Sequence, residues 1–138
     1  MMISKKGRYT LRVMVDLAEN SDGGYVMLKD IAERQELPEA YIIRIMEFLS
    51  EHGMVDIMNE EQKYHLSMSP DKYRVGIILR LVEGTLAPVE CLDCKSGKCE
   101  RSEKCSTLPM WKEVDRLING YFDNLSLEMI MNMPKEER

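Results

Sequence analysis

Apolar side chains recur at helical spacing through the first half of the chain. Residues 8–19 carry such a stripe, which comprises Leu11, Met14, Val15 and Ala18. A second, shorter helix is predicted over residues 29–35, and a third over residues 38–52. The apolar face of the third helix comprises Tyr41, Ile42, Ile45, Met46 and Leu49. Because only a short turn separates the second helix from the third, we expect the two to meet at a steep angle.

Short apolar runs bounded by turn residues predict strands on either side of this helix pair. Residues 25–28 form one brief strand, and residues 54–58 and 63–67 form two more. The polar run 59–62 joins the last two strands as a hairpin.

Two further helices are predicted in the second half of the chain. The first begins near residue 69 and runs to about residue 82, and the second spans residues 109–124. Apolar side chains recur along the second of these at alternating steps of three and four, at Trp111, Val114, Ile118, Tyr121 and Leu125. Such a seam packs against the same helix of a second copy, or else forms an ordinary core stripe within one chain.

The order of helix, short helix, turn, helix and hairpin is typical of a winged helix-turn-helix. We therefore predict a mostly α fold, with this DNA-binding module followed by a long C-terminal dimerisation helix. The predicted boundaries are 1–70 for the winged module, 71–87 for a connecting helix, 88–107 for a cysteine-rich loop, and 108–138 for the dimerisation helix and tail.

In a helix-turn-helix, the first residues of the second helix reach the base edges in the major groove. Here the candidates are Glu39, Ala40, Tyr41 and Arg44. The net charge is −5, yet residues 1–12 contain basic side chains and no acidic ones. This N-terminal tip offers contacts to phosphates from Lys5, Lys6 and Arg8, with Tyr9 beside them. A helical core whose charged surface binds no DNA is the alternative, because residues 13–70 hold four basic and twelve acidic side chains.

All four cysteines lie within fifteen residues, with the spacing C-x2-C-x4-C-x5-C, at Cys91, Cys94, Cys99 and Cys105. Thiolates are soft ligands that suit iron–sulfur clusters and zinc, and four of them complete the coordination shell of either. No stretch approaches the roughly 20 apolar residues of a membrane span, and no apolar segment follows the N-terminal charges as in a signal peptide. We therefore expect a cytoplasmic protein without a membrane partner, whose cysteines bind a metal centre rather than remain free or form disulfides.

Several segments spread over the whole chain match one set of known motifs. They are SKKGRY at 4–9, LRVMVDLA at 11–18, LKDIAERQ at 28–35, VGIILRLVEG at 75–84, LAPV at 86–89, and the cysteine segment followed by Trp111. With these motifs the chain resembles the Rrf-two family of bacterial winged-helix transcription regulators. The resemblance implies a homodimeric repressor that binds double-stranded operator DNA. It also implies an iron–sulfur cluster, of the 2Fe–2S type, with zinc as the alternative metal.

Three features of this chain depart from the family pattern. Family wings carry an arginine and several glycines, whereas residues 58–64 contain no glycine and two acids, Glu60 and Glu61, which would repel phosphates. Lys63 is the basic residue left there as a candidate for DNA binding. The start of the recognition helix also differs, so the operator preference of the relatives does not carry over. Leu108 stands where some relatives have a ligating histidine, so a fourth cysteine could take that place in an all-cysteine site. The first family cysteine falls between Cys91 and Cys94 in register, which leaves open whether three or all four cysteines ligate.

Other functions fit part of the sequence. A dimeric interaction module stabilised by zinc or a cluster, with weak or lost DNA binding, would agree with the acidic wing. A thiol enzyme would use Cys91 and Cys94 as a redox pair, but the βαβ setting in which such pairs normally occur is missing from the predicted elements. Neither a hydrolase triad nor a phosphate-binding glycine loop is recognisable, so no enzymatic activity is predicted.

Overall fold

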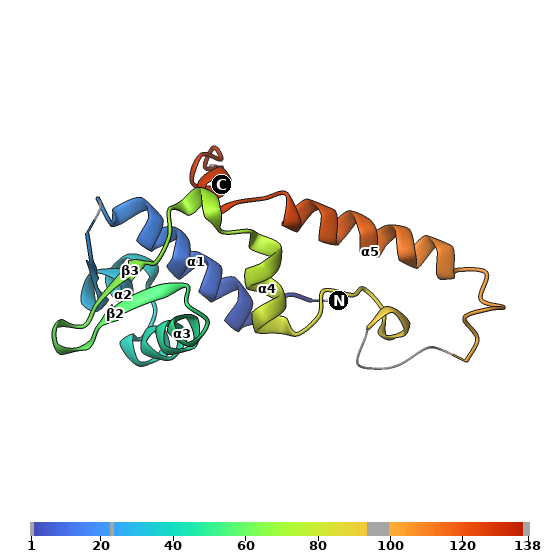
Figure 1. Cartoon of the computed structure of the whole chain (residues 1–138), viewed down its shortest axis with the longest axis horizontal. Coiled ribbons are helices and arrows are strands. Elements are labelled where there is room, and N and C mark those ends of the chain that lie inside the picture. The colour runs from blue at the N-terminus through green and yellow to red at the C-terminus, as the bar shows by residue number, and fades with distance from the viewer. Residues whose placement is uncertain (1, 23, 94–99, 137–138) are drawn as a thin grey trace.

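The structure is a computed structural model, and it describes residues 2–22, 24–93 and 100–136. Helices and a small sheet pack together in one body, and helix α5 extends away from it as an arm (Figure 1). The helices are α1 (Lys5–Asn20), α2 (Leu28–Gln35), α3 (Glu39–Glu51), α4 (Val75–Glu83), α5 (Leu108–Asp123) and α6 (Leu127–Met131). The strands are β1 (Val26–Met27), β2 (Val55–Met58) and β3 (Lys63–Leu66). Short 3₁₀ turns occupy Asn59–Glu61, Pro70–Lys72 and Glu90–Leu92.

The predicted order of a winged helix-turn-helix is confirmed, and the fold is mostly helical, but α1 begins at Lys5 rather than at residue 8. The reason is a polar cap that apolar spacing does not reveal. The side chain of Ser4 accepts a hydrogen bond of 3.1 Å from the backbone N–H of Gly7, which satisfies a donor of the first turn. Lys5 and Lys6 therefore belong to an ordered helical turn rather than to a free N-terminal segment.

The turn between α2 and α3 is held by one residue in the left-handed region and one buried side chain. Glu36 adopts φ 55° and ψ 47°, and the N–H of Leu37 donates to the carbonyl of Ala32 at 3.1 Å. Leu37 is buried, and Pro38 then takes the extended conformation that precedes α3. These contacts fix the angle between the two helices without a long loop.

The sheet is antiparallel, with the strand order β1-β3-β2. Tyr64 of the central strand pairs with Val26 on one side and with Ile57 on the other, and Tyr64 and Val26 are buried. The next residue towards the hairpin tip, Lys63, lies on the opposite, outer face and pairs with Met27 and Met58. This alternation packs one face of the sheet on the helices and leaves the other towards solvent.

The single helix predicted from residue 69 to about residue 82 is wrong. The chain instead forms the 3₁₀ turn Pro70–Lys72, passes through Tyr73 and Arg74 in extended conformation, and begins α4 at Val75. The extended residues pair with a distant segment, because the N–H of Leu127 donates to the carbonyl of Tyr73 at 3.2 Å, and Arg74 forms a β-bridge with Ser126. The hydroxyl of Tyr73 also donates to the carbonyl of Met54 at 2.6 Å, which ties the break to the body.

The main core lies between α1, α2, α3 and the inner face of the sheet. Side chains from beyond residue 70 also enter it, namely Tyr73, Ile78 and Leu127. A second, smaller cluster joins α4 to the C-terminal half of α5 and comprises Val75, Leu79, Leu86 and Leu125, with Ile118 and Phe122 packed against them. Within the described ranges, no helix has both the length and the apolar character that a membrane crossing requires.

A buried carboxylate joins α1 to α2. Asp16 is 2% exposed and accepts hydrogen bonds from Arg34 Nε at 2.9 Å, Arg34 Nη2 at 2.8 Å and Gln35 Nε2 at 2.8 Å. Arg12 reaches the same place, where it donates to the side chain and the backbone carbonyl of Gln35. The end of α2, and hence the turn that leads into α3, is thus anchored to α1.

We expect Asp16→Ala to lower the free energy of unfolding by about 2 kcal/mol, because it removes charge-assisted hydrogen bonds to Arg34 and Gln35. Arg34→Met should cost more, about 3 kcal/mol, since it leaves the Asp16 carboxylate buried without its cation. Urea unfolding followed by circular dichroism measures both losses, and exposed Glu19→Ala on the same helix serves as the control. Equal stabilities for wild type and Asp16→Ala would contradict this role.

Candidate functional site

The first turn of α3 is accessible to a ligand. Glu39, Ala40 and Arg44 are exposed, and Tyr41 is half-buried. The opposite face of the helix is buried in the main core through Ile42, Ile45, Met46 and Leu49. The predicted apolar face of α3 is therefore confirmed, and the predicted base-reading residues lie on its accessible side.

The basic tip of α1 lies against α3. Lys6 Nζ is 4.4 Å from the centroid of the Phe48 ring, and the rings of Tyr9 and Tyr41 meet edge to face with centroids 5.6 Å apart. Lys5, Lys6 and Arg8 remain exposed. The structure thus brings the candidates for phosphate contact next to the candidates for base contact. We call this surface the α1–α3 face, and it comprises Lys5, Lys6, Arg8, Tyr9, Glu39, Ala40, Tyr41 and Arg44.

Lys63 lies apart from these residues, in the β2–β3 hairpin. Its ammonium group is 2.7 Å from the carboxylate of Glu61, and its side chain is half-buried. The other candidate DNA-binding cations, Lys5, Lys6, Arg8 and Arg44, show no ion pair to an acidic side chain within the described residues. Of the predicted DNA-binding residues, Lys63 is therefore already paired with Glu61 of its own hairpin.

Helix α4 supports the start of α1. The backbone N–H and the hydroxyl of Ser4 both donate to Oε1 of Glu83, at 3.0 and 2.6 Å. Ser4 is the residue that caps α1, so Glu83 holds the turn that carries Lys5 and Lys6. Gly7 permits this approach, because a Cβ at that position would collide with the Glu83 carboxylate.

One turn earlier on α4, Arg80 binds α5. Arg80 Nη1 donates to Oδ1 of Asn119 at 2.9 Å, and Nη2 forms an ion pair with Asp123. Gly76 lies at this contact, and a Cβ there would collide with the Asp123 carboxylate. Helix α4 therefore connects α5 to the capped start of α1 through two charged side chains.

Neither Arg80 nor Glu83 was predicted from the sequence as a functional residue. Glu83 and Arg80 are ordinary charged residues in the sequence, and no local pattern assigns them partners. A signal was present in Gly7 and Gly76, because a glycine inside a helical pattern often marks the close approach of another element.

The structure describes two of the four predicted metal ligands. Cys91 lies in the 3₁₀ turn Glu90–Leu92, and Cys105 lies shortly before α5; both are half-buried and neither forms a disulfide. Cys94 and Cys99 lie outside the described residues. The side chain of Thr107 lies 3.3 Å from the sulfur of Cys105, and hydrogen bonding from Thr107 lowers the pKa of that thiol below its ordinary value. Cys105 is thereby suited to act as a thiolate ligand.

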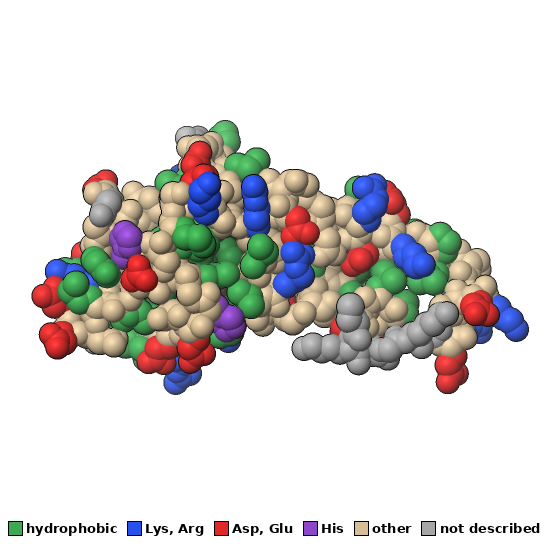
Figure 2. Space-filling view, viewed as in Figure 1, with side chains coloured by type: hydrophobic (Ala, Val, Ile, Leu, Met, Phe, Trp, Pro, Cys, Tyr) green, Lys and Arg blue, Asp and Glu red, His purple; other side chains and the backbone are tan. Residues whose placement is uncertain are grey.

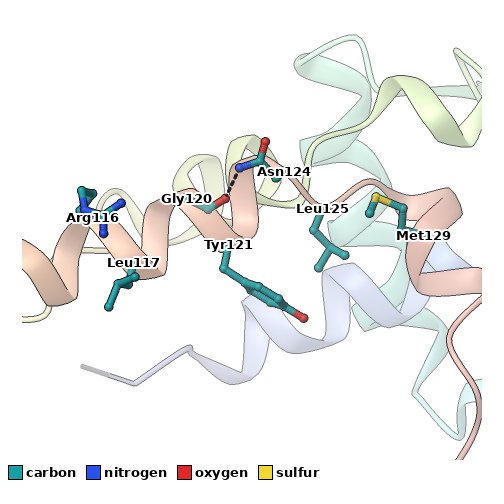
Figure 3. Close-up of a pocket in the computed structure, with 7 residues that line it drawn as sticks. All are labelled: Arg116, Leu117, Gly120, Tyr121, Asn124, Leu125 and Met129. Atoms are coloured by element: carbon teal, nitrogen blue, oxygen red, sulfur yellow. Dashed lines mark hydrogen bonds between the residues drawn. The ribbon is translucent and has the colours of Figure 1, made fainter.

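The arm formed by α5 carries a groove at its junction with α6. The groove has a volume of about 490 Å³ and is lined by Arg116, Leu117, Gly120, Tyr121, Asn124, Leu125 and Met129. Leu117, Tyr121 and Leu125 project from the same side of the arm (Figure 3). Leu117 is 55% exposed and Tyr121 is 60% exposed, so this chain leaves a large apolar surface uncovered. Of the predicted seam, Ile118 and Leu125 pack instead in the second core with α4, and the exposed Leu117 was not among the predicted seam residues.

Comparison with known proteins agrees with this architecture. A family model named Rrf2 and described as an iron-dependent transcriptional regulator matches residues 3–133. The chain belongs to the Rrf2 family. It is 29% identical over 133 residues to the HTH-type transcriptional regulator IscR of Escherichia coli K12, a match that covers 96% of this chain and 81% of the relative.

Two solved structures share the fold along nearly the whole chain. The global cysteine regulator CymR of B. subtilis superposes with a TM-score of 0.79 at 29% identity, covering 98% of this chain and 99% of the other. IscR of T. potens superposes with a TM-score of 0.73 at 30% identity, covering 99% and 94%. These relatives are transcriptional regulators, so this Rrf2 protein is a DNA-binding transcription regulator and not an enzyme.

The contact between Glu83 and Ser4 should affect DNA binding by this Rrf2 protein. We expect Glu83→Ala to weaken binding about 3- to 10-fold and to reduce its dependence on salt, because Lys5 and Lys6 lose their fixed position. Glu83→Gln should bind like wild type, since its amide oxygen still accepts both hydrogen bonds. Fluorescence anisotropy with duplexes tiled across the region upstream of the protein's own gene, at several KCl concentrations, measures both effects. An unchanged salt dependence in Glu83→Ala would show that the Ser4 cap does not position the tip.

Proposed function

We propose that this protein is a homodimeric cytoplasmic repressor whose operator binding is modulated by an iron–sulfur cluster held by Cys91, Cys94, Cys99 and Cys105. The observation that carries the proposal is that all four cysteines lie in one segment of the sequence, between α4 and α5, the two helices that Arg80 connects. A bound iron–sulfur cluster would link these thiols to one another, and that link would be sensitive to iron supply and to oxidation.

The residues present fit such a group. Soft thiolates are the ligands that iron–sulfur clusters prefer, and four complete the shell without the histidine that Leu108 replaces. The described cysteines are free and partly accessible, and Thr107 favours the thiolate form of Cys105. The family description as an iron-dependent regulator favours iron over zinc, and a 2Fe–2S cluster is the form we propose.

The uncovered surface of α5 supports the homodimer. None of the sixteen residues of α5 is buried. Its large apolar side chains Met110, Leu117 and Tyr121 are at least half exposed. A second copy of the same helix would cover the groove beside α6 and bring two α1–α3 faces to one operator. Two such faces match the two half-sites that dimeric helix-turn-helix proteins read on one side of the duplex.

The position of α4 supports a route from the cysteine segment to DNA. Thiolates that share one centre would tie the residues after α4 to those before α5, and so restrain where α5 lies. Arg80 and Glu83 then connect α5 to the cap of α1. A coupling free energy of 1–3 kcal/mol between the two sites corresponds to roughly a 5- to 150-fold change in operator affinity.

Dimerisation should be lost when a charge is placed in the groove. We expect Leu117→Asp to convert the dimer to monomer at micromolar concentration, because a carboxylate would be buried between two apolar helices. Sedimentation velocity measures the change, and Lys112→Asp on the same helix, exposed and outside the groove, is the matched control. A Leu117→Asp protein that still sediments as a dimer would place the interface elsewhere.

The cluster is tested on protein purified without oxygen. We expect a coloured protein containing iron and sulfide, and loss of iron from each single Cys→Ser variant. Operator affinity, measured by gel shift on the upstream DNA of its own gene, should differ at least 5-fold between loaded wild type and the quadruple serine variant. Equal affinities would end the proposal, and one dispensable cysteine would end the all-cysteine site. Colourless protein with one zinc per chain would instead support a dimeric module with a structural metal.

A further inference from the structure

The tip of the β2–β3 hairpin has a fixed shape. Residues Asn59–Glu61 form a 3₁₀ turn, and Gln62 follows in the left-handed region with φ 50°. The carbonyl of Gln62 accepts a hydrogen bond of 2.9 Å from the N–H of Leu28, at the start of α2. The tip is therefore anchored to the body, and its side chains keep a defined direction relative to the α1–α3 face.

The charge at this tip is acidic. Glu60 and Glu61 are exposed and adjacent, and Asp56 adds a third carboxylate at the base of the hairpin. Acidic side chains gather at the end of the molecule where the two strands turn (Figure 2). Asp56 faces His65 at 3.7 Å, while Glu60 has no cationic partner among the residues that the structure describes.

Lys63 is not available to attract a ligand to this acidic tip. It lies in the central strand, between Met27 of β1 and Met58 of β2 in the register of the sheet. Its ammonium group is bound to Glu61 at 2.7 Å, and its side chain is 34% exposed. A phosphate that approached Lys63 would have to displace a carboxylate of the same hairpin.

An acidic tip of this kind is repelled by the phosphates of nucleic acid. The minor groove is narrow and bordered by phosphates, and proteins that enter it do so with arginine or lysine. A tip with two carboxylates and one engaged ammonium carries net negative charge, and it is repelled at the distance where a basic tip would be attracted. Among the residues that the structure describes, the cations of the α1–α3 face form no ion pair with an acidic side chain.

We infer that the hairpin tip is an exclusion element, in which Glu60 and Glu61 keep it away from the DNA backbone, so that the operator is bound through the α1–α3 face alone. This inference rests on the proposed operator binding and specifies which part of the winged module takes part. It also revises the role of Lys63, which pairs with Glu61 and does not contact phosphate in the wild-type protein.

The test compares five proteins by fluorescence anisotropy on duplexes tiled across the upstream region, titrated with KCl. They are wild type, Lys63→Gln, Glu60→Gln/Glu61→Gln, the triple variant that combines these changes, and the control Glu128→Gln/Glu136→Gln. The control removes the same charge from two exposed positions in α6 and the C-terminal tail. Melting temperatures verify that all five are folded.

We expect Lys63→Gln to bind within 2-fold of wild type and with the same salt dependence. Glu60→Gln/Glu61→Gln should bind about 3- to 10-fold more tightly than the control, and its salt slope should steepen by about one, because a freed Lys63 neutralises one phosphate. The triple variant should return to the wild-type salt slope and keep only the part of the gain that comes from the removed repulsion. Weaker binding by Lys63→Gln in the wild-type background, or equal binding by the double variant and its control, would overturn the inference. Absence of binding by wild type and all variants would overturn the proposed operator binding itself.

Discussion

Helix α4 is held by a charged side chain on each side, and the placement of the α1–α3 face relative to α5 depends on that attachment. Arg80 binds Asn119 and Asp123 of α5, and Glu83 binds the residue that caps α1. Helix α4 also buries Val75 and Leu79 in the second core, so it is a packed element of the fold and not a flexible linker. A displacement of α5 relative to the body must therefore move α4 or break these bonds. Either result changes the support of Lys5 and Lys6.

Apolar spacing predicts those parts of the fold in which a helix packs on a core through its own stripe. The face of α3 is of this kind, since the predicted Ile42, Ile45 and Leu49 are all buried. On α1 only Met14 of the predicted stripe is buried, Leu11, Val15 and Ala18 are partly buried, and the core also takes Val13 and Leu17, which were not predicted. The break before α4 could not be predicted, because Tyr73 is extended through pairing with Leu127, which lies far away in the sequence. Periodicity reports local preference, and a contact between distant segments can override it. The early start of α1 was missed for a different reason, since a polar cap leaves no apolar signal.

The same contrast between local pattern and distant contact applies to the candidate site. Residue types and their order predicted which side chains of α1 and α3 lie together on the accessible α1–α3 face, because that geometry belongs to the helix-turn-helix itself. The roles of Arg80 and Glu83 depend on partners that only the tertiary structure brings near. The seam of α5 shows the same limit. Its spacing identified an apolar helix, but it did not show that Ile118 would pack on α4 while Leu117 and Tyr121 stay uncovered.

The net charge bears on how the proposed operator binding would work. Nonspecific affinity for DNA comes from cations that neutralise phosphates, and this chain has a net charge of −5 although residues 1–12 carry four basic and no acidic side chains. We therefore expect a low background affinity for any duplex, and in the proposed dimer tight binding would require both α1–α3 faces to reach their half-sites together. Binding of the second face then depends on the distance between the two. In the proposed mechanism, a rotation of α5 transmitted through Arg80 and Glu83 would change that distance for both faces at once, whereas a strongly basic protein would remain bound through one face alone.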